Sequence, residues 1–412
     1  MCSSLKIRNM QNKISLSNWA EKFVFLLLIW SSLLTEVKIS HTNYGIHNVL
    51  TPFFALLLIA LRAKIAKNVF LYHNRIIALL ILFYVWMWFG AFLSEYQETA
   101  IKYSIRCTYY PIIFVAFLII TFENRNVTDY PKLIFYFLLF ISAFGIVEKI
   151  YPQIWNIKVL QLLREPFPVD THRIASFLFN PNPFGFLMSF GIFLGLVLYA
   201  NDGNKTLSRY WFYLGSISFS TTAILSGSRN AWFVLIVGVL FAGLYRVIKI
   251  KDIITVIVAS LGLLFIMVLL SKGSMDFFAI MNARFIETFQ NGLGERVLLW
   301  KQAIVEFYQH PIFGIGMEVF SRHIGTKVLG GNYHTHNIIL NILVELGIVG
   351  FTILLLFIAI LLKRANISNS MVAIPLALLF VSQMFDYFFF NAVFMNIFLY
   401  FMAFACNSKV SD

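Results

Sequence analysis

Residues 334–362 read HTHNIILNILVELGIVGFTILLLFIAILL. After its first four residues the stretch is mostly apolar, and it is long enough to cross about 30 Å of hydrocarbon as a helix. A helix satisfies its own backbone hydrogen bonds inside lipid. Ionisable side chains beside hydrocarbon are costly, and they usually serve a function. The stretch therefore predicts a membrane-spanning helix over 336–362 with a functional site at its polar end.

The whole chain has the composition of a polytopic membrane protein. Of its 412 residues 59% are hydrophobic and only 12% are charged, whereas a soluble domain has about 25% charged residues. We expect an all-α fold with about twelve transmembrane helices. The predicted spans are 20–37, 46–62, 76–94, 104–122, 133–150, 177–200, 211–226, 229–248, 252–271, 336–362, 371–388 and 391–406.

The distribution of Lys and Arg predicts the orientation. If the N-terminus lies inside the cell, 18 of the 32 Lys and Arg residues fall in inside segments and only 4 in short outside loops. Because basic residues favour the inside in short loops, we expect both termini to be cytoplasmic. The net charge of +13 is thereby explained without a nucleic-acid partner. The remaining ten basic residues lie in two longer outside segments, about 151–176 and 272–335.

The second of these outside segments contains a predicted amphipathic helix. Over 295–309 the sequence is ERVLLWKQAIVEFYQ, with apolar side chains at helical spacing from Val297 to Tyr308. Such a pattern is typical of a helix lying on a surface. It is either a helix that only rests on the membrane or a lid that presents Arg296 to an anionic group.

Two further polar turns lie on the same predicted side. One is Ser226-Gly-Ser-Arg229-Asn230, between two spans, and the other joins His172-Arg173 to Asn180-Pro-Asn182-Pro. Each can be a plain turn with interfacial anchors. Each can also bind an anion, because an arginine near hydrocarbon must reach water, pair or bind a ligand.

Three arginines and a histidine thus gather on one face of the membrane. Guanidinium groups suit phosphate oxygens bidentately, so a diphosphate at the outer leaflet is the simplest common ligand of Arg173, Arg229 and Arg296. A histidine is a suitable general base at neutral pH. His334 and His336 are both candidates for that role.

A metal site is not expected. The two histidines are two residues apart, which does not place them on one helical face, and the chain has no HExxH motif. The three cysteines, Cys2, Cys107 and Cys406, are far apart in the chain, which indicates neither a metal site nor a disulfide framework.

These features resemble the bacterial O-antigen ligase and O-antigen polymerase superfamily over about 170–350. The four motifs that carry the resemblance are Arg173 followed by Phe179-Asn-Pro-Asn182, Ser226-Gly-Ser-Arg229, Gly294-Glu-Arg296 followed by Trp300 and His310-Pro-Ile-Phe-Gly-Ile-Gly316, and His336-Asn337-x9-Gly347-x-x-Gly350. The x9 glycine spacing marks His336 rather than His334 as the matching histidine.

The resemblance implies an inverting, metal-independent glycosyltransferase without a cofactor. Its donor would be a glycan on undecaprenyl diphosphate, and its active site would face the periplasm from the bacterial cytoplasmic (inner) membrane. His336, Arg229 and Arg296 are the candidate catalytic residues. The candidates for binding diphosphate or acceptor are Arg173, Asn182, Arg284, His334 and Asn337.

The acceptor class stays open at this point. A ligase would use a sugar of the lipid A core in lipopolysaccharide biosynthesis, and a polymerase would use a second lipid-linked repeat unit. The full glycine spacing favours the ligase. A polysaccharide transporter or flippase is the alternative from another class, but it would show an internal repeat and polar residues at the midplane. We expect five N-terminal spans and a periplasmic loop in 1–176, and the catalytic region in 177–412.

Overall fold

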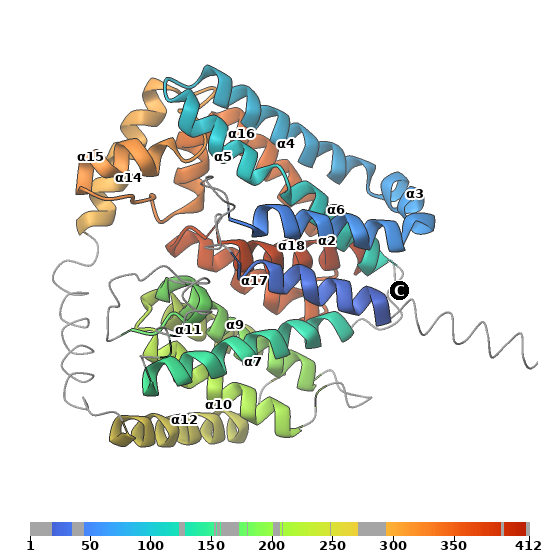
Figure 1. Ribbon diagram of the computed structural model, residues 1–412, viewed down its shortest axis with the longest axis vertical. Coiled ribbons are helices and arrows are strands. Elements are labelled where there is room, and N and C mark those ends of the chain that lie inside the picture. Colours follow the sequence, from blue (N-terminus) through green and yellow to red (C-terminus); the bar gives the residue numbers. More distant parts are fainter. Residues whose placement is uncertain are drawn as a thin grey trace, which may run out of the picture.

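A computed structural model describes residues 19–34, 45–122, 128–151, 154, 157, 173–178, 180–200, 207, 209–247, 249–270, 294–388 and 391–408. Within these residues the chain forms helices and no β-strand. Most of the long helices run side by side across the molecule (Figure 1). The predicted all-α fold is confirmed.

Every predicted span coincides with a helix. The first is helical over 19–31. The others are α2 (His47–Leu61), α4 (Asn74–Leu93), α6 (Tyr110–Phe122), α7 (Asp129–Ile150), α9 (Pro181–Ala200), α10 (Arg209–Leu225), α11 (Arg229–Leu244), α12 (Ile250–Leu270), α16 (Ile338–Arg364), α17 (Ser370–Phe385) and α18 (Ala392–Asn407).

Not all of these helices are long enough to cross a membrane by themselves. By length and composition five segments qualify, and a sixth does if the bent pair α2–α3 is one span. The five are Asn74–Leu93, Gln97–Phe122, Asp129–Ile150, Pro181–Ala200 and Ile338–Arg364. A helical membrane protein is therefore confirmed, and the count of twelve crossings stays a prediction.

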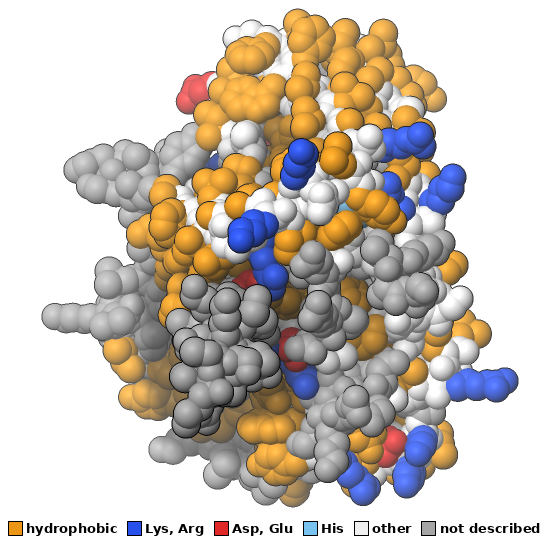
Figure 2. All heavy atoms as spheres, turned by 90° about the vertical axis from the view of Figure 1, so that its right-hand side faces the viewer, with side chains coloured by type: hydrophobic (Ala, Val, Ile, Leu, Met, Phe, Trp, Pro, Cys, Tyr) orange, Lys and Arg blue, Asp and Glu red, His pale blue; other side chains and the backbone are white. Residues whose placement is uncertain are grey.

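The remaining elements lie at the two ends of the helix bundle. At one end α3 (Ala63–Tyr72) turns away from α2 by 96°, near the point where α18 ends (Figure 1). Figure 2 shows single Lys and Arg side chains scattered over the hydrophobic surface of this end. At the opposite end lie α14 (Gly294–Gln309) and α15 (Thr326–Leu329), with the π-helical turn η3 (Phe320–Gly325) between them in the chain.

The N-terminal and C-terminal helices share one core. α18 packs against α6, and α16 packs against α4. α9 contacts α7, α10, α11 and α17, and 83% of its most apolar window is buried. Nothing in this packing separates 1–176 from 177–412, so the predicted division of the chain at 176 stays a prediction.

The helix α16 is broken at Gly347. Its backbone has φ +66° and ψ −174° there, which glycine adopts readily because it has no Cβ. The segment after α14 fills the break, since Ile348 N donates to Pro311 O at 2.8 Å and Trp86 Nε1 donates to Leu346 O at 2.9 Å. These bonds replace the lost helical ones, as irregular backbone inside a membrane protein requires. The sequence predicted one continuous helix, and this part of the prediction is wrong.

Gly347→Ala should therefore destabilise the protein strongly. A Cβ atom at this position would lie 2.1 Å from Ile312 O, and alanine tolerates the positive φ poorly. Strain and overpacking together should cost about 2–5 kcal/mol, measured as a lower temperature of unfolding in detergent. The matched control is Gly243→Ala in α11, where a Cβ meets nothing within 4 Å. Equal unfolding temperatures for the two variants would show that the break is not required.

Candidate active site

The polar stretch 334–337 lies at the end of the bundle opposite α3, immediately before α16. Asn337 is the N-cap of α16, and its Oδ1 accepts a hydrogen bond from Leu340 N at 3.1 Å. Its Nδ2 donates to Met384 O at 3.4 Å, which ties the cap to the end of α17. The helix thus begins at Ile338 rather than at His336, and His336 stands before it with a φ of +54°.

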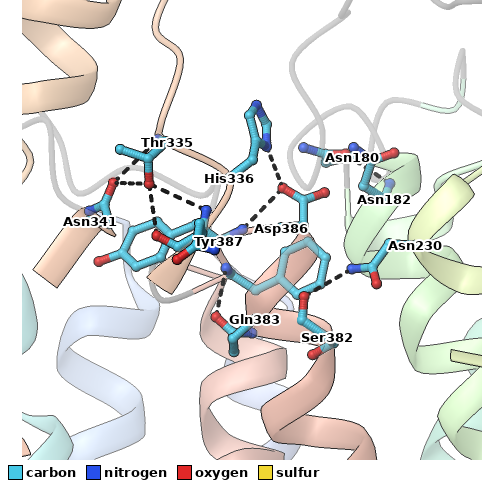
Figure 3. Close-up of polar contacts among 12 residues, drawn as sticks. Asn180, Asn182, Asn230, Thr335, His336, Asn341, Ser382, Gln383, Asp386 and Tyr387 are labelled. Atoms are coloured by element: carbon cyan, nitrogen blue, oxygen red, sulfur yellow. Dashed lines mark hydrogen bonds and ion pairs between the residues drawn. The ribbon is translucent and has the colours of Figure 1, made fainter. Parts of the chain in front are cut away.

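His336 is paired with a carboxylate that the sequence analysis did not identify. Its Nδ1 lies 2.8 Å from Oδ1 of Asp386, which follows α17 (Figure 3). The same Oδ1 accepts a hydrogen bond from Tyr387 N at 3.0 Å. Because Nδ1 is engaged with the carboxylate, Nε2 is the ring nitrogen that can meet a substrate hydroxyl.

Asp386 is held as a carboxylate although it is buried. Burial by itself would raise its pKa, but the hydrogen bond with His336 and the charges of His336 and Arg296 outweigh this effect and bring the pKa below its usual value. A buried carboxylate that stays ionised orients a histidine and stabilises its protonated form. The pair therefore has the arrangement of a general base and its orienting group.

Arg296 of α14 lies close enough to Asp386 and to Arg229 of α11 for their charges to act on it. Burial lowers the pKa of the Arg296 guanidinium, Asp386 opposes this shift, and the charge of Arg229 adds to it. Arg229 is the first residue of α11, whose N-cap Ser228 accepts a hydrogen bond from Ala231 N at 3.3 Å. Two guanidinium groups beside a helix N-terminus form a site suited to an anion.

Arg173 forms hydrogen bonds with both polar turns, the one at Ser226 and the one at Asn182. Its Nε donates to Ser226 O at 2.7 Å and its Nη2 donates to Asn182 Oδ1 at 2.8 Å. Asn182 N in turn donates to Asn180 Oδ1 at 2.9 Å. The two polar turns of the sequence are thus joined by one side chain.

Asn230 connects the turn of Arg229 to the helix that carries Asp386. Its Nδ2 donates to Ser382 O at 3.3 Å (Figure 3). This contact brings the N-terminus of α11 beside the end of α17. The hairpin arginine and the carboxylate partner of His336 are therefore held on neighbouring elements.

The two histidines differ in their surroundings. His334 Nδ1 lies 3.5 Å from Glu318 Oε2, and the His334 ring packs against Tyr387 with centroids 4.8 Å apart. Burial, and after it the charge of His336, lower the pKa of His334 to about 3, against a weaker opposing effect of Asp386. His334 is therefore neutral at physiological pH and a weak base, because an efficient general base has a pKa near the working pH.

Thr335, between the two histidines, fixes the segment from both sides. Trp300 Nε1 of α14 donates to Thr335 O at 2.7 Å. Thr335 Oγ1 donates to Asn337 O at 2.8 Å, and Thr335 N donates to Asn341 Oδ1 at 3.4 Å. Figure 3 shows Thr335 and Asn341 beside the His336–Asp386 pair. The hydrogen bonds of Thr335 link the position of α14, which carries Arg296, to the position of His336.

The predicted helix over 295–309 is present as α14. Leu299 and Ala303 are the buried residues of α14, whereas Val297, Ile304 and Tyr308 are exposed. The helix packs against α16. The exposed apolar face is the side available to lipid, in agreement with a helix on a surface.

Arg284 lies outside the described residues. The described part of the chain contains no group of three or more His, Cys, Asp or Glu residues placed to hold a metal ion.

The site lies largely within a region that matches a known family. Residues 214–355 match the model of the O-antigen ligase family. The resemblance to the O-antigen ligase and polymerase superfamily is confirmed. The O-antigen ligase region includes Arg229, Arg296 and His336, whereas Arg173 and Asp386 lie outside it. The match supports a membrane enzyme that processes glycans. Neither the curated proteins nor the solved structures include a match to this chain.

Proposed function

We propose that the protein is a glycosyltransferase that moves a glycan from undecaprenyl diphosphate to a hydroxyl group of an acceptor glycan, as an O-antigen ligase does. The observation that carries this proposal is the His336–Asp386 pair beside Arg229 and Arg296, in a chain that matches the O-antigen ligase family. The acceptor we favour is the lipid A core. Joining of two lipid-linked repeat units by a polymerase is the alternative that the same geometry supports.

In the proposed reaction the acceptor oxygen attacks the anomeric carbon from the side opposite the diphosphate, so the configuration inverts. The bond between the anomeric carbon and the diphosphate oxygen breaks, and its electron pair goes to the diphosphate. The hydroxyl proton goes to His336 Nε2, and Asp386 stabilises the imidazolium that forms. Arg229 and Arg296 compensate the charge that develops on the diphosphate.

The other candidates have supporting roles in this proposal. Arg173 holds the Ser226 turn and Asn182 in place, so we assign it the positioning of the turn that carries Arg229. Asn337 caps α16 and ties it to the end of α17 beside His336, so we assign it the positioning of the acceptor-binding segment. His334 and Asn182 border the site, and Arg284 is proposed from the sequence alone.

The proposed orientation places this site in the periplasm. The site lies at the end of the bundle opposite α3, whose end of the molecule carries scattered Lys and Arg side chains (Figure 2). Basic residues favour the cytoplasmic side. Both termini would then be cytoplasmic in the inner membrane.

Arg296→Lys should slow transfer at least about tenfold, because an ammonium group keeps the charge but cannot form the two parallel hydrogen bonds of a guanidinium group with a diphosphate. The measurement is the rate of transfer from a lipid-linked glycan in membranes. Arg246→Lys, next to the end of α11 and remote from the site, is the matched control. A wild-type rate for Arg296→Lys would argue against a role on the diphosphate.

Deletion of the gene tests the function itself. Electrophoresis of the surface polysaccharide should show loss of all long glycan from the lipid A core while the lipid-linked polymer is still made. Core that carries a single repeat unit would identify a polymerase instead. An unchanged surface polysaccharide, with unchanged lipid-linked intermediates, would rule out both activities.

A further inference from the structure

Two acidic side chains that the proposed reaction does not use are buried together beneath the active-site segment. Glu345 lies on α16, two residues before the break, with no exposed surface, and Glu318 is 2% exposed. The charge of the Glu345 carboxyl group acts on Glu318. Glu318 has a φ of +64°, an uncommon conformation for a residue with a side chain.

The segment that carries Glu318 is docked on the break by backbone hydrogen bonds. Ile315 N donates to Val344 O at 2.9 Å, and Gly316 N donates to Glu345 O at 3.0 Å. At Gly314 a Cβ atom would lie 2.4 Å from Glu345 O, so the two chains touch without room for a side chain. The backbone that leads to Glu318 is therefore held against the turn of α16 that carries Glu345.

Several buried polar atoms around the pair lack a hydrogen bond within the described part of the chain. They are both carboxyl oxygens of Glu345, Oε2 of Glu318 and Nδ2 of Asn341. Asn341 has no exposed surface and stands one helical turn before Glu345, where its side chain faces the Glu345 carboxyl group. Ionised carboxylates in such a place are very costly unless they are neutralised.

The charged and titratable groups around the pair offer only partial compensation. Arg322 Nε lies 3.8 Å from Glu318 Oε1, and His334 is 3.5 Å from Oε2. The other groups whose charges act on the pair or that lie beside it are Arg106, Cys107, Tyr103 and Tyr387. Burial, and after it the charge of Glu345, raise the pKa of Glu318 well above its ordinary value of 4.5, against the opposing effects of Arg322 and Arg106.

We propose that Glu318 and Glu345 form a proton-binding site at the break of α16, in which one shared proton keeps the segment 311–318 docked on the helix. Both groups are buried and the charge of Glu345 acts on Glu318, so the two cannot both ionise without mutual repulsion. Loss of the shared proton sets two negative charges against each other across the docked contact. The segment then loses its attachment to the break.

The site connects directly to the active-site segment. Asn341 accepts a hydrogen bond from Thr335 N, the residue between the two histidines, and Glu318 contacts His334. Loss of the proton would therefore weaken the contacts that hold residues 334–337 against α16 and Glu318. The structure assigns to this buried pair the role of holding the base in position.

The sign of the pH effect follows from the raised pKa of Glu318. In the folded protein the group keeps its proton at pH values where the unfolded chain has already lost it, so its contribution to stability is complete below 4.5. That contribution falls as the pH rises from 4.5 to the folded pKa. A glutamine in place of either glutamate imitates the protonated form at every pH.

The test is thermal unfolding of the full-length protein in detergent at pH 6, 7, 8 and 9. We expect the unfolding temperature of the wild type to fall with pH, and that of Glu345→Gln and Glu318→Gln to fall less, ending roughly 2–4 °C above the wild type at pH 9. Glu98→Gln, at an exposed carboxylate of α5 (Gln97–Cys107), is the matched control and should follow the wild type. The measurement uses no glycan substrate, so its result is independent of the proposed function.

Three outcomes would overturn the proposal. One is a wild-type pH slope in both glutamine variants. Another is failure of both variants to fold at pH 6, where an amide should replace a protonated carboxyl group. The third is a stabilisation of the wild type by calcium or magnesium that EDTA reverses and the glutamine variants lack, since the pair would then hold a cation instead of a proton.

Discussion

His336→Ala should lower the rate of glycan transfer by roughly 10²–10⁴-fold and leave the amount of folded protein in the membrane nearly unchanged. His336 is the group placed to take the acceptor proton, with Nδ1 fixed on Asp386 at 2.8 Å. Its side chain is partly exposed, so few packing contacts are lost. The measurement is transfer from a lipid-linked glycan, normalised to the protein in the membrane.

The backbone at His336 calls for a second variant. With a φ of +54°, alanine is strained, whereas asparagine tolerates this conformation. His336→Asn should therefore show the same loss of rate with wild-type stability. His334→Asn is the matched comparison and should lose less activity, because a buried histidine with a pKa of about 3 is a weak base. Full activity in His336→Asn would show that His336 is not the general base. A larger loss in His334→Asn than in His336→Asn would identify His334 as the base instead.

Hydropathy predicted where the helices lie because a span is a local property of the sequence. Each apolar window contains a helix, since a helix is the form in which a single segment inside lipid satisfies its own backbone hydrogen bonds. The break of α16 was not predictable in the same way. Gly347 permits the unusual φ, but what stabilises it is the segment around Pro311 and the indole of Trp86, 261 positions away in the chain.

The candidate site was predicted in part for a related reason. Arg229 and His336 were recognisable as polar residues at the ends of apolar runs, and Arg296 as a basic residue of the amphipathic helix. In the structure Arg296 is within range of the charges of Arg229 and of Asp386, the partner of His336. Asp386 was missed because it is 50 residues from His336. A lone carboxylate near the outer end of the predicted span 371–388 was the available signal. Arg173 holds its position through hydrogen bonds to Ser226 and Asn182. The sequence placed Arg173 and Asn182 in one motif, but no sequence pattern predicted the contact with Ser226.

Asp386→Asn should reduce transfer by roughly 10³–10⁴-fold, although it changes one atom of the side chain. An asparagine can turn its amide NH₂ toward Nδ1 of His336, and the proton of the ring then sits on Nε2. In that tautomer Nε2 cannot accept the acceptor proton. The variant also removes the negative charge that acts on Arg296 and that stabilises the imidazolium.

The rate of the Asp386→Asn enzyme should stay low at every pH from 6 to 9, because deprotonation of another group does not restore the tautomer. Asp252→Asn is the matched control, since Asp252 is also a buried carboxylate with a hydrogen bond, from Tyr213 at 2.6 Å, but lies at the start of α12, away from the site. Its transfer rate should be close to that of the wild type. If Asp386→Asn transferred glycan within a factor of about three of Asp252→Asn, the carboxylate would not be the partner of the base, and the proton would have to leave His336 without its help.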